Sequence, residues 1–461
     1  MSRVAAQVEK KGIPVVLESF DDKGIRQIAH DNFLREGVPA VREVYTPQDT
    51  TLQSLPEEFI PRFIDQLTRS LTDEEKKSGF YEYDRHEGVL MTGTFDEVSG
   101  FLQGELIDHP SIGPIAEMTD GLPIIPPTQK RVEAMLKGTS HDPEEILEFP
   151  GFLVGSKRLG NVRKAAINAV MAGCTPDMMP AVLAIAEAGA AVGYPGDSSF
   201  GHLYCVSGPY GREIGMNSGF CYLAPGNPAN MTLQRAAMLM GINLGGARMG
   251  INVLERTGSL HWGTIFAEDE NTPWEGLNEH FGFSSDESVL LSWGGKVQLV
   301  PFQNIEVKSV ETLQDNMLGS PDHAVEALKT LTNTNGAILA FTPDAANSWA
   351  EVYGFRTMKD IQEYMYKHAT WKRSVWGKNY WIQVLGRGRK GGAYPRAGRL
   401  EADIVQGPKM DDLQALSDDA DIPKFDAPED ITIIVAGGTG DAWTWGGAFG
   451  RPIAYSIDKW R

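Results

Sequence analysis

The sequence predicts an α/β protein with a truncated flavodoxin-like N-terminal lobe and a larger mixed α/β body. Three observations support this class. β-Branched apolar runs alternate with segments of helical periodicity, glycines close many of those segments, and 42% of the 461 residues are hydrophobic. Strands that alternate with helices favour parallel pairing. A chain of this length can bury several cores, so more than one domain is expected.

Residues 1–54 are predicted to form a partial βαβ lobe. A helix at 3–12 closes on Gly12, a strand follows at 13–20, a second helix spans 21–37, and a strand covers 38–47. Most α/β domains begin with a strand, whereas this sequence opens on a helix. We therefore expect a partner chain to complete the sheet, with residues 89–93 as the alternative source of the missing strand.

Three further regions follow the N-terminal lobe. Residues 55–118 are predicted to be an acidic, mostly helical connector, 119–320 an α/β body that carries the candidate site loops, and 321–461 a C-terminal α/β part. Helical spacing recurs at 128–136, in two small-residue helices within 161–193, and at 228–246. Strands are expected at 201–207, 288–295, 297–310, 336–343 and 430–438, and helices at 322–331 and 358–371. Residues 411–430 are expected to be a surface linker, and the sequence contains no internal repeat of fixed period.

Composition narrows the class of protein. The net charge is −19 and the lysines and arginines form no long run, which argues against a nucleic-acid partner. Cys174, Cys205 and Cys221 have no metal-type spacing, and three cysteines fit a reducing compartment better than a disulfide framework. The N-terminus lacks a signal-peptide core and no run reaches 18 apolar residues. We therefore expect a cytoplasmic protein with no membrane partner.

The strongest candidate site is the acidic stretch around Glu268, Asp269 and Glu270, which follows an apolar strand. Strand alternation predicts that Glu268 and Glu270 share one face. With His261, these two carboxylates could transfer protons, while Trp274 and His280 would line the substrate pocket. The alternatives are a divalent metal bound by His261, Glu268, Glu270 and His280, or a strand end whose acids face water.

A second candidate is the glycine-bracketed loop within 211–230. Its Asn217 and Ser218 could orient a polar substrate group, because backbone and amide donors in such loops bind anions or carbonyl oxygens. Asn230 is predicted to cap the next helix and to contribute to substrate binding.

Other segments carry weaker signals. Cys174 lies between two helices, where a thiol could be activated, although a small buried cysteine is the commoner outcome for it and for the other two cysteines. The cationic glycine loop at 386–399 could hold an anion or be solvated. The glycine turn at 435–447 completes no nucleotide-binding fingerprint, so Trp443 and Trp445 could instead line an apolar pocket.

Two sets of segments resemble known bacterial families. "VEKKGIPVV" and "AHDNFLREGVPAV" resemble the region of UGSC proteins that follows their Sec- or Cys-containing loop, and UGSC proteins are similar to selenoprotein B of glycine, sarcosine and betaine reductases. "TDGLPIIPPTQKRVEAML", "AINAVMAGCTPDMMPAVLAIAEA", "GMNSG", "NLGGA" and "FAEDENTPWE", within 119–300, and the late "IIVAGG" resemble a little-characterised family associated with UGSC domains. The reactive loop of the UGSC family has no counterpart here, so the resemblance implies that a Cys-loop-bearing partner subunit supplies the thiol. "APGNPAN" departs from the glycine- and arginine-containing form of the second family.

The leading hypothesis is therefore a subunit of a heteromeric, oligomeric bacterial enzyme that acts on a small-molecule substrate at a C–S or C–N bond, as a lyase or a reductase. The competing hypotheses are the metal-dependent lyase or hydrolase described above and a non-catalytic scaffold or ligand-binding subunit. No cofactor is predicted, and a divalent metal is the alternative.

Overall fold

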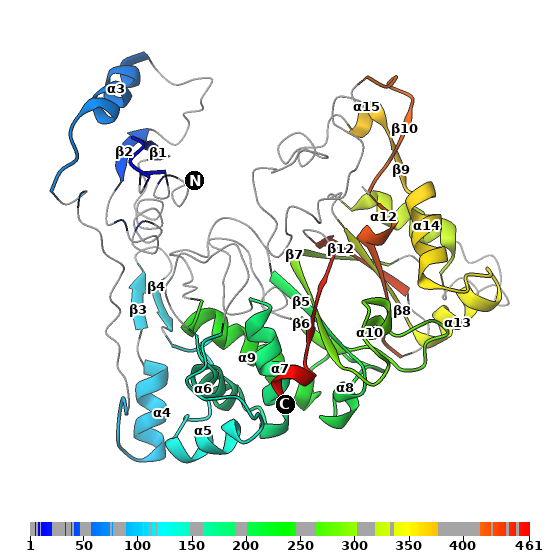
Figure 1. Cartoon of the computed structure of the whole chain (residues 1–461), viewed down its shortest axis with the longest axis horizontal. Coiled ribbons are helices and arrows are strands. Elements are labelled where there is room, and N and C mark those ends of the chain that lie inside the picture. The colour runs from blue at the N-terminus through cyan, green and yellow to red at the C-terminus, as the bar shows by residue number, and fades with distance from the viewer. Residues whose placement is uncertain are drawn as a thin grey trace.

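The chain folds as a mixed α/β protein (Figure 1). The computed structural model describes residues 5, 8–9, 11–20, 33, 38, 41–46, 57–73, 76, 89–104, 106–109, 113–116, 118–147, 160–189, 201–245, 264–301, 319–331, 336–376, 415–425, 427–438, 442–448 and 451–461. The general α/β class predicted from the sequence is confirmed.

The N-terminal strands pair in parallel, as the sequence predicts. Strand β1 (Val16–Phe20) lies beside β2 (Arg42–Thr46), with Val16 opposite Arg42. The half-buried Glu9 accepts a hydrogen bond of 3.0 Å from the Val15 backbone N–H and pairs with Arg42 at 3.3 Å. Among the described residues β1 and β2 form a two-stranded sheet, and residues 89–93, the expected alternative third strand, are not in a strand.

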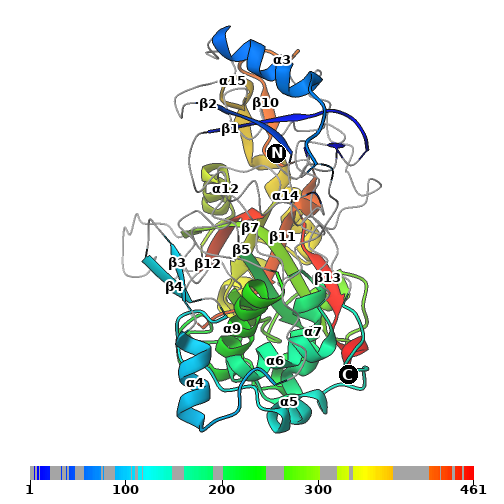
Figure 2. The same cartoon turned by 90° about the vertical axis from the view of Figure 1, so that its left-hand side faces the viewer.

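The connector is partly helical and also contains an unpredicted hairpin. Its helical elements are η1 (Glu57–Phe59), α3 (Ile60–Thr68) and α4 (Phe95–Gly104). Strands β3 (Leu106–His109) and β4 (Gly113–Ala116) then pair antiparallel. Figure 2 shows β1, β2 and α3 together at one end of the molecule, with α4 at the other.

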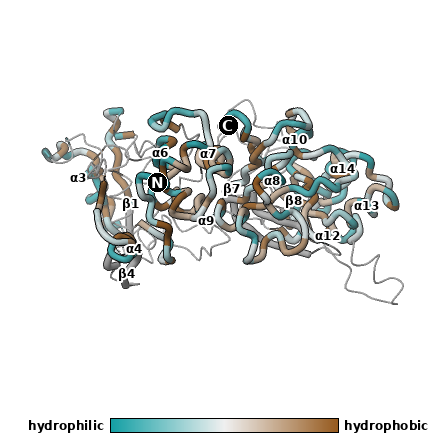
Figure 3. Tube along the Cα trace, turned by 90° about the horizontal axis from the view of Figure 1, so that it is seen from below, coloured by the Kyte–Doolittle hydropathy of each residue, from teal (hydrophilic) through white to brown (hydrophobic). Residues whose placement is uncertain are grey.

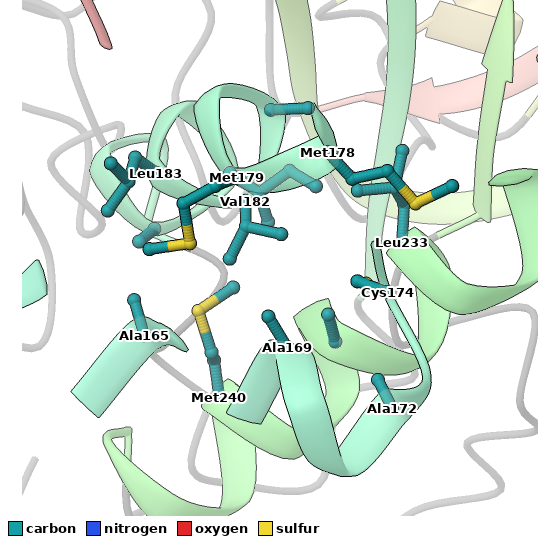
Figure 4. Close-up of a cluster of buried hydrophobic side chains, with 14 of the residues drawn as sticks. Ala165, Ala169, Ala172, Cys174, Met178, Met179, Val182, Leu183, Leu233 and Met240 are labelled. Carbon is teal, nitrogen blue, oxygen red and sulfur yellow. The ribbon is translucent and has the colours of Figure 1, made fainter. Parts of the chain in front are cut away.

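A layer of helices follows, at α5 (Gln129–Leu136), α6 (Val162–Ala172), α7 (Met179–Glu187) and α9 (Pro228–Asn243). The Asn161 side chain accepts a hydrogen bond from Lys164 N and caps the start of α6, and Gly173 ends that helix at φ 93°. Alanines of α6 face methionines of α7 and α9 (Figure 4), so these helices pack closely. The most hydrophobic parts of the trace include α7 (Figure 3).

Seven strands of the described chain form the main sheet, in the order β11-β8-β12-β7-β5-β6, with β13 also paired to β7. Their bounds are β5 (Gly201–Ser207), β6 (Thr264–Ala267), β7 (Val289–Pro301), β8 (Ala337–Phe341), β11 (Ile431–Val435), β12 (Ala442–Ala448) and β13 (Ile453–Ser456). The two strands expected at 288–295 and 297–310 begin as the single strand β7. The sheet also runs across the expected domain boundary at residue 320.

Both faces of the sheet are buried. Side chains alternate along a strand, and accordingly Tyr204 and Val206 of β5 join the cluster formed with α6, α7 and α9. Their neighbours Leu203 and Cys205 join the second cluster, which contains residues of α12 (Pro321–Thr330), α13 (Pro343–Glu351) and α14 (Met358–His368). β6, β8 and β11 are wholly buried. Because both faces of these strands are covered, their sequences are nearly continuous apolar runs.

The pattern of parallel and antiparallel pairing in the main sheet is the same from either edge. β5 pairs in parallel with β6 and antiparallel with β7, and β8 pairs in parallel with β11 and antiparallel with β12. β7 and β12 then pair antiparallel at the centre. The body therefore contains two copies of one β-α-β-β pattern, β5-α9-β6-β7 and β8-α14-β11-β12, which the absence of a fixed sequence period had concealed.

Several C-terminal elements differ from the sequence prediction. Helix α13 was not predicted, although Thr342 caps it through Ala345 N and Pro343 begins it. Residues 421–430 are not a surface linker: β10 (Asp421–Pro423) pairs with β9 (Thr370–Lys372), and Lys424 and Phe425 are fully buried. The remaining short elements are η2 (Pro176–Met178), α8 (Tyr210–Glu213), α10 (Leu277–His280), α15 (Arg373–Trp376), η5 (Pro428–Asp430) and η6 (Asp458–Trp460).

Among the described helices, none has both the length and the apolar composition needed to cross a bilayer.

Candidate functional site

The carboxyl ends of β5, β6 and β11 meet at one end of the main sheet. β5 ends at Ser207 and β6 ends just before Glu268, so their following residues lie side by side. The outer strands β6 and β11 also meet here, because Asp269 N donates a hydrogen bond of 2.7 Å to Val435 O. Open α/β sheets place ligands at such carboxyl ends, and this edge carries the acidic stretch singled out from the sequence.

Glu268 is a carboxylate held within protein at this edge. It retains partial exposure, and its oxygens accept hydrogen bonds from Ser207 Oγ at 2.6 Å and from Leu277 N at 3.0 and 3.2 Å. Burial raises its pKa to about 7, outweighing those two hydrogen bonds, and the charges of Asp269 and Glu275 act in the same direction as burial. A carboxyl group with such a pKa exchanges a proton readily near neutral pH.

Ser207 can hydrogen-bond Glu268 in either protonation state. Its Oγ accepts a hydrogen bond from Asn278 N at 2.8 Å and has two acceptors within reach, Glu268 Oε2 at 2.6 Å and Asn278 Oδ1 at 3.2 Å. With Glu268 ionised, the hydroxyl donates to the carboxylate. With Glu268 protonated, Ser207 can accept from the carboxyl O–H and turn its own hydrogen to Asn278 Oδ1. Both Ser207 and Asn278 are buried.

The Asn278 side chain is itself fixed in orientation. Its Nδ2 donates to Ser284 O at 3.0 Å and to Glu287 O at 2.9 Å, which leaves Oδ1 directed toward Ser207. The sequence interpretation overlooked both Ser207 and Asn278. A signal was available for Ser207, because a hydroxyl ends the predicted strand next to Gly208, whereas nothing local distinguished Asn278.

Asp269 is buried and joins two loops. Its Oδ1 accepts from Asn271 N at 2.9 Å and Asn271 Nδ2 at 2.8 Å, and its Oδ2 lies 3.3 Å from Ser218 Oγ. The carbonyl oxygen of Ser218 also accepts a hydrogen bond of 2.6 Å from Gly437 N. The two loops chosen from the sequence, 215–230 and 261–280, are therefore in contact through Ser218 and Asp269.

Three asparagines fix the loop that contains Ser218. Asn230 Oδ1 accepts from Asn217 N at 3.0 Å, and Asn230 Nδ2 donates to Asn217 O at 2.9 Å and Tyr222 O at 3.1 Å. Asn217 Nδ2 donates in turn to Asn227 Oδ1 at 2.9 Å. The expectation that Asn230 caps the next helix is wrong: the cap position is Asn227, and Asn230 lies inside the first turn of α9. Asn217 and Asn230 thus have structural partners.

The glycine turn after β11 lies against the same loop. A side chain at Gly438 would come within 2.3 Å of the Phe220 ring, and Gly437, at φ 117°, lies close to Thr342 and Tyr222. Phe220 is 68% exposed. A large exposed aromatic ring thus lies over a glycine turn in which Gly437 has the positive φ that glycine adopts without strain.

The remaining predicted site residues point elsewhere. β6 ends at Ala267, so strand alternation does not govern the acids, and the exposed Glu270 pairs with Arg212 rather than sharing a face with Glu268. Trp274 is buried, with Nε1 donating to Phe355 O at 3.0 Å and its ring packed on Phe341. It is part of the core rather than a pocket wall.

The proposed metal ligands are not brought together among the described residues. His280 Nδ1 lies 3.0 Å from Glu275 Oε1, while Glu268 and Glu270 have the separate partners given above. His261 and Trp262 lie outside the described residues. In the part of the chain that the structure describes, no group of three or more His, Cys, Asp or Glu side chains is arranged to hold a metal ion.

Two of the three cysteines are buried packing residues, as expected. Burial raises the pKa of Cys174 to about 12, and burial also raises that of Cys205 well above its usual value. Cys174 lies in the helical cluster of Figure 4. The expectation of a buried residue is wrong for Cys221, which is exposed and has φ 55°.

Two other candidate segments add little. The cationic loop 386–399 lies outside the described residues, and Trp443 and Trp445 belong to β12, with side chains outside the described part. The described residues also enclose a pocket of about 620 Å³ near α8, lined by residues that include Lys137, Asp177, Tyr210 and Arg461 and none of the acidic stretch. Glu268 differs from the titratable residues that line this pocket, because Ser207 can hydrogen-bond it in either protonation state.

Comparison with known proteins adds no identification, since no family model, curated protein or solved structure matches this chain.

Proposed function

We propose that this chain is an enzyme subunit in which Glu268 is the proton-transfer residue. The observation that carries the proposal is the pair of acceptors around Ser207, at 2.6 Å on Glu268 and 3.2 Å on Asn278. A purely structural carboxylate needs partners in one protonation state only. A general acid–base group passes through both states in each turnover, and here each state keeps its hydrogen bonds.

The position and pKa of Glu268 support the same proposal. The residue lies at the carboxyl ends of β5 and β6, and burial raises its pKa to about 7. Perturbed titratable groups cluster at functional sites. The neighbouring Ser218 hydroxyl, Phe220 ring and Gly437–Gly438 turn would bind the parts of the substrate that do not react.

We further propose that the reaction occurs at a C–S or C–N bond, as a lyase or reductase step, and that a partner subunit supplies the thiol. The bond type and the partner rest on the resemblance to UGSC proteins, and so does a flavodoxin-like form for the N-terminal lobe. One observation agrees with a thiol provided in trans: β1 and β2 have no third strand among the described residues. Of this chain's own thiols, Cys174 and Cys205 are buried with raised pKa values, whereas Cys221 is exposed.

The test is to express the chain with the product of its neighbouring gene and to measure turnover of a panel of small thioethers and amines. Glu268→Gln keeps the side-chain volume and removes the titration, so we expect kcat to fall about 100-fold or more. Glu270→Gln is the matched control, because Glu270 is two residues away and pairs with Arg212 at the surface, and it should keep activity within a few-fold.

Three results would contradict parts of this proposal. An active complex that is unaffected by Glu268→Gln would exclude Glu268 as the proton-transfer residue. An isolated chain that is fully active without a second polypeptide would exclude the partner. Equal losses in both variants would show that the acidic stretch acts through general charge rather than through one carboxyl group.

A further inference from the structure

The last residues of the sequence, Ile457 to Arg461, form a strap across three distant elements, and we use that name for this segment. Ile457 N donates to Ser288 O at 2.9 Å, and Asp458 Oδ2 accepts from Ser288 N at 2.6 Å. Trp460 Nε1 donates to Glu187 Oε2 at 3.0 Å, and Lys459 pairs with the same carboxylate. The strap therefore joins the start of β7 to the end of α7.

The strap also contributes one residue, Arg461, to the lining of the 620 Å³ pocket. Arg461 lines that pocket, where its Nη1 lies 2.9 Å from Glu213 Oε2 and its guanidinium carbon lies 5.1 Å from the centre of the Tyr210 ring. Lys137 and Ile214 also line it. Movement of the strap would withdraw Arg461 and open the pocket.

His141 holds the strap through both ring nitrogens. Its Nε2 lies 2.7 Å from Lys459 O, and its Nδ1 lies 2.8 Å from Glu145 Oε2. A carbonyl oxygen and a carboxylate are both acceptors, so only the doubly protonated imidazolium can donate to both. The ring also lies on Trp460, with centroids 4.6 Å apart. The neutral ring must give up one of these two hydrogen bonds.

Two hydroxyl groups beside His141 also bond the strap, and we call residues 139–141 the clasp. Thr139 Oγ1 donates to Trp460 O at 2.6 Å, and Ser140 Oγ donates to Arg461 O at 2.5 Å. These bonds do not titrate. Residues 139, 140 and 141 thus hydrogen-bond the backbone oxygens of Trp460, Arg461 and Lys459, respectively, and His141 is the titratable member of the three.

The charged groups that face His141 come from two sides. On its own segment, Glu145 contacts the ring directly. The Glu144 carboxylate instead accepts hydrogen bonds from Arg163 and Asn161, and that of Asp142 accepts one from Glu144 N. From the strap comes Lys459, whose charge opposes protonation and is paired with Glu187 of α7. Burial lowers the pKa of His141, but the hydrogen bonds to Lys459 O and Glu145, together with the charge of Glu145, outweigh it and raise the pKa overall.

We propose that residues 457–461 are a proton-dependent strap, which the protonated His141 clasps against the body and which opens the Arg461 side of the pocket when His141 loses its proton. Because the folded-state pKa is raised, the clasp is complete below the ordinary value of 6.5 and weakens as the pH rises through the higher folded value. Opening is thus favoured in alkaline solution.

Hydrogen exchange of the full-length chain, corrected for the intrinsic effect of pH, tests this proposal. The amides of Ile457 and Arg461, bonded to Ser288 O and Asp458 O, should lose protection by about tenfold or more between pH 6 and pH 8.5. His141→Gln, which keeps one neutral donor, should show little of that pH dependence. His323→Gln is the matched control, because His323 contacts a hydroxyl, Ser320 Oγ, in another part of the chain.

A second measurement needs no variant and remains informative if His141→Gln fails to fold. The ring ¹⁵N shifts of His141 in the wild-type chain should report two protonated nitrogens at pH 6 and one at pH 8.5. A neutral ring at pH 6, or strap protection that is the same at both pH values, would overturn the proposal. So would a His141→Gln chain whose strap keeps the full wild-type pH response.

Discussion

Asp269 N donates a hydrogen bond of 2.7 Å to the carbonyl oxygen of Val435, and this bond joins the two outermost strands of the main sheet. The sheet therefore curls until its edges meet at their carboxyl ends. Glu268 and Ala436 occupy equivalent places in the two β-α-β-β units, since each donates its N–H at 2.8 Å to the parallel neighbour, to Val206 O and Phe341 O respectively. One unit supplies carboxylates to the junction, and the other supplies a glycine turn.

The stability of the chain should fall as the pH rises from about 5 to about 8, in part because of Glu268. Its pKa is raised from 4.5 to about 7, so the folded state binds more protons than the unfolded state within this window. Glu268→Gln should remove about 1–3 kcal/mol of that pH dependence. Denaturant unfolding at pH 5.5 and pH 8 measures it, with Glu270→Gln as the control. A variant with the wild-type pH dependence would contradict the assigned pKa.

Cys221 should be the first of the three cysteines to react with a thiol reagent. It is exposed, whereas Cys174 and Cys205 are buried and their pKa values are raised, so few thiolates form at neutral pH. We expect one thiol to react rapidly in the native chain and the other two to react only after unfolding. Peptide mapping identifies the site, and Cys221→Ser should abolish the rapid phase. Rapid labelling of Cys174 in the native chain would disagree with the packing of α6 and α7.

Gly208→Ala should destabilise the fold by about 2–4 kcal/mol. Gly208 has φ 95°, and an added Cβ would lie 2.4 Å from Glu287 O and 2.9 Å from Ser288 Cα. The backbone cannot move aside, because Asn278 bonds Glu287 O and Asp458 bonds Ser288 N. Gly215→Ala is the matched control: Gly215 has φ 70° with open space around it, so only the backbone strain of about 1–2 kcal/mol applies. Equal losses of stability in the two variants would show that the close contact is unimportant.

Asn230→Ala should lower the free energy of unfolding by about 1–3 kcal/mol, because it leaves Asn217 N, Asn217 O and Tyr222 O without this partner. The same change should raise hydrogen exchange at Gly437 N, which bonds the Ser218 carbonyl in the loop that Asn230 fixes. Gln129→Ala, which removes one exposed hydrogen bond to Glu133, is the control. Unchanged exchange at Gly437 would separate the asparagine network from the site.

The sequence by itself determined elements whose causes are local. The helices at α6, α12 and α14 start at Asn161, Ser320 and Thr357, whose side chains satisfy the first free N–H groups of each helix. The parallel pairing of β1 and β2 followed from a strand–helix–strand pattern in 54 residues. The sequence also identified the loops of Ser218 and Asp269 as candidate site segments, since both are polar and bounded by glycines.

Only the tertiary structure decided which side chains form the site and which way they face. Ser207 and Glu268 are 61 positions apart, and Ser207 and Asn278 are 71 apart, so no local period relates them. The rule that side chains alternate along a strand misplaced Glu270, because β6 ends at Ala267, just before the acids. The end of β6 is set by its pairing with β5 and not by the acidic segment itself. β12 was missed for the same reason: its Gly- and Trp-rich sequence is held as a strand by β7 and β8 on either side. Local sequence specifies where chain segments begin and end, whereas hydrogen bonds between distant segments determine the partners of a buried carboxylate and hence its charge.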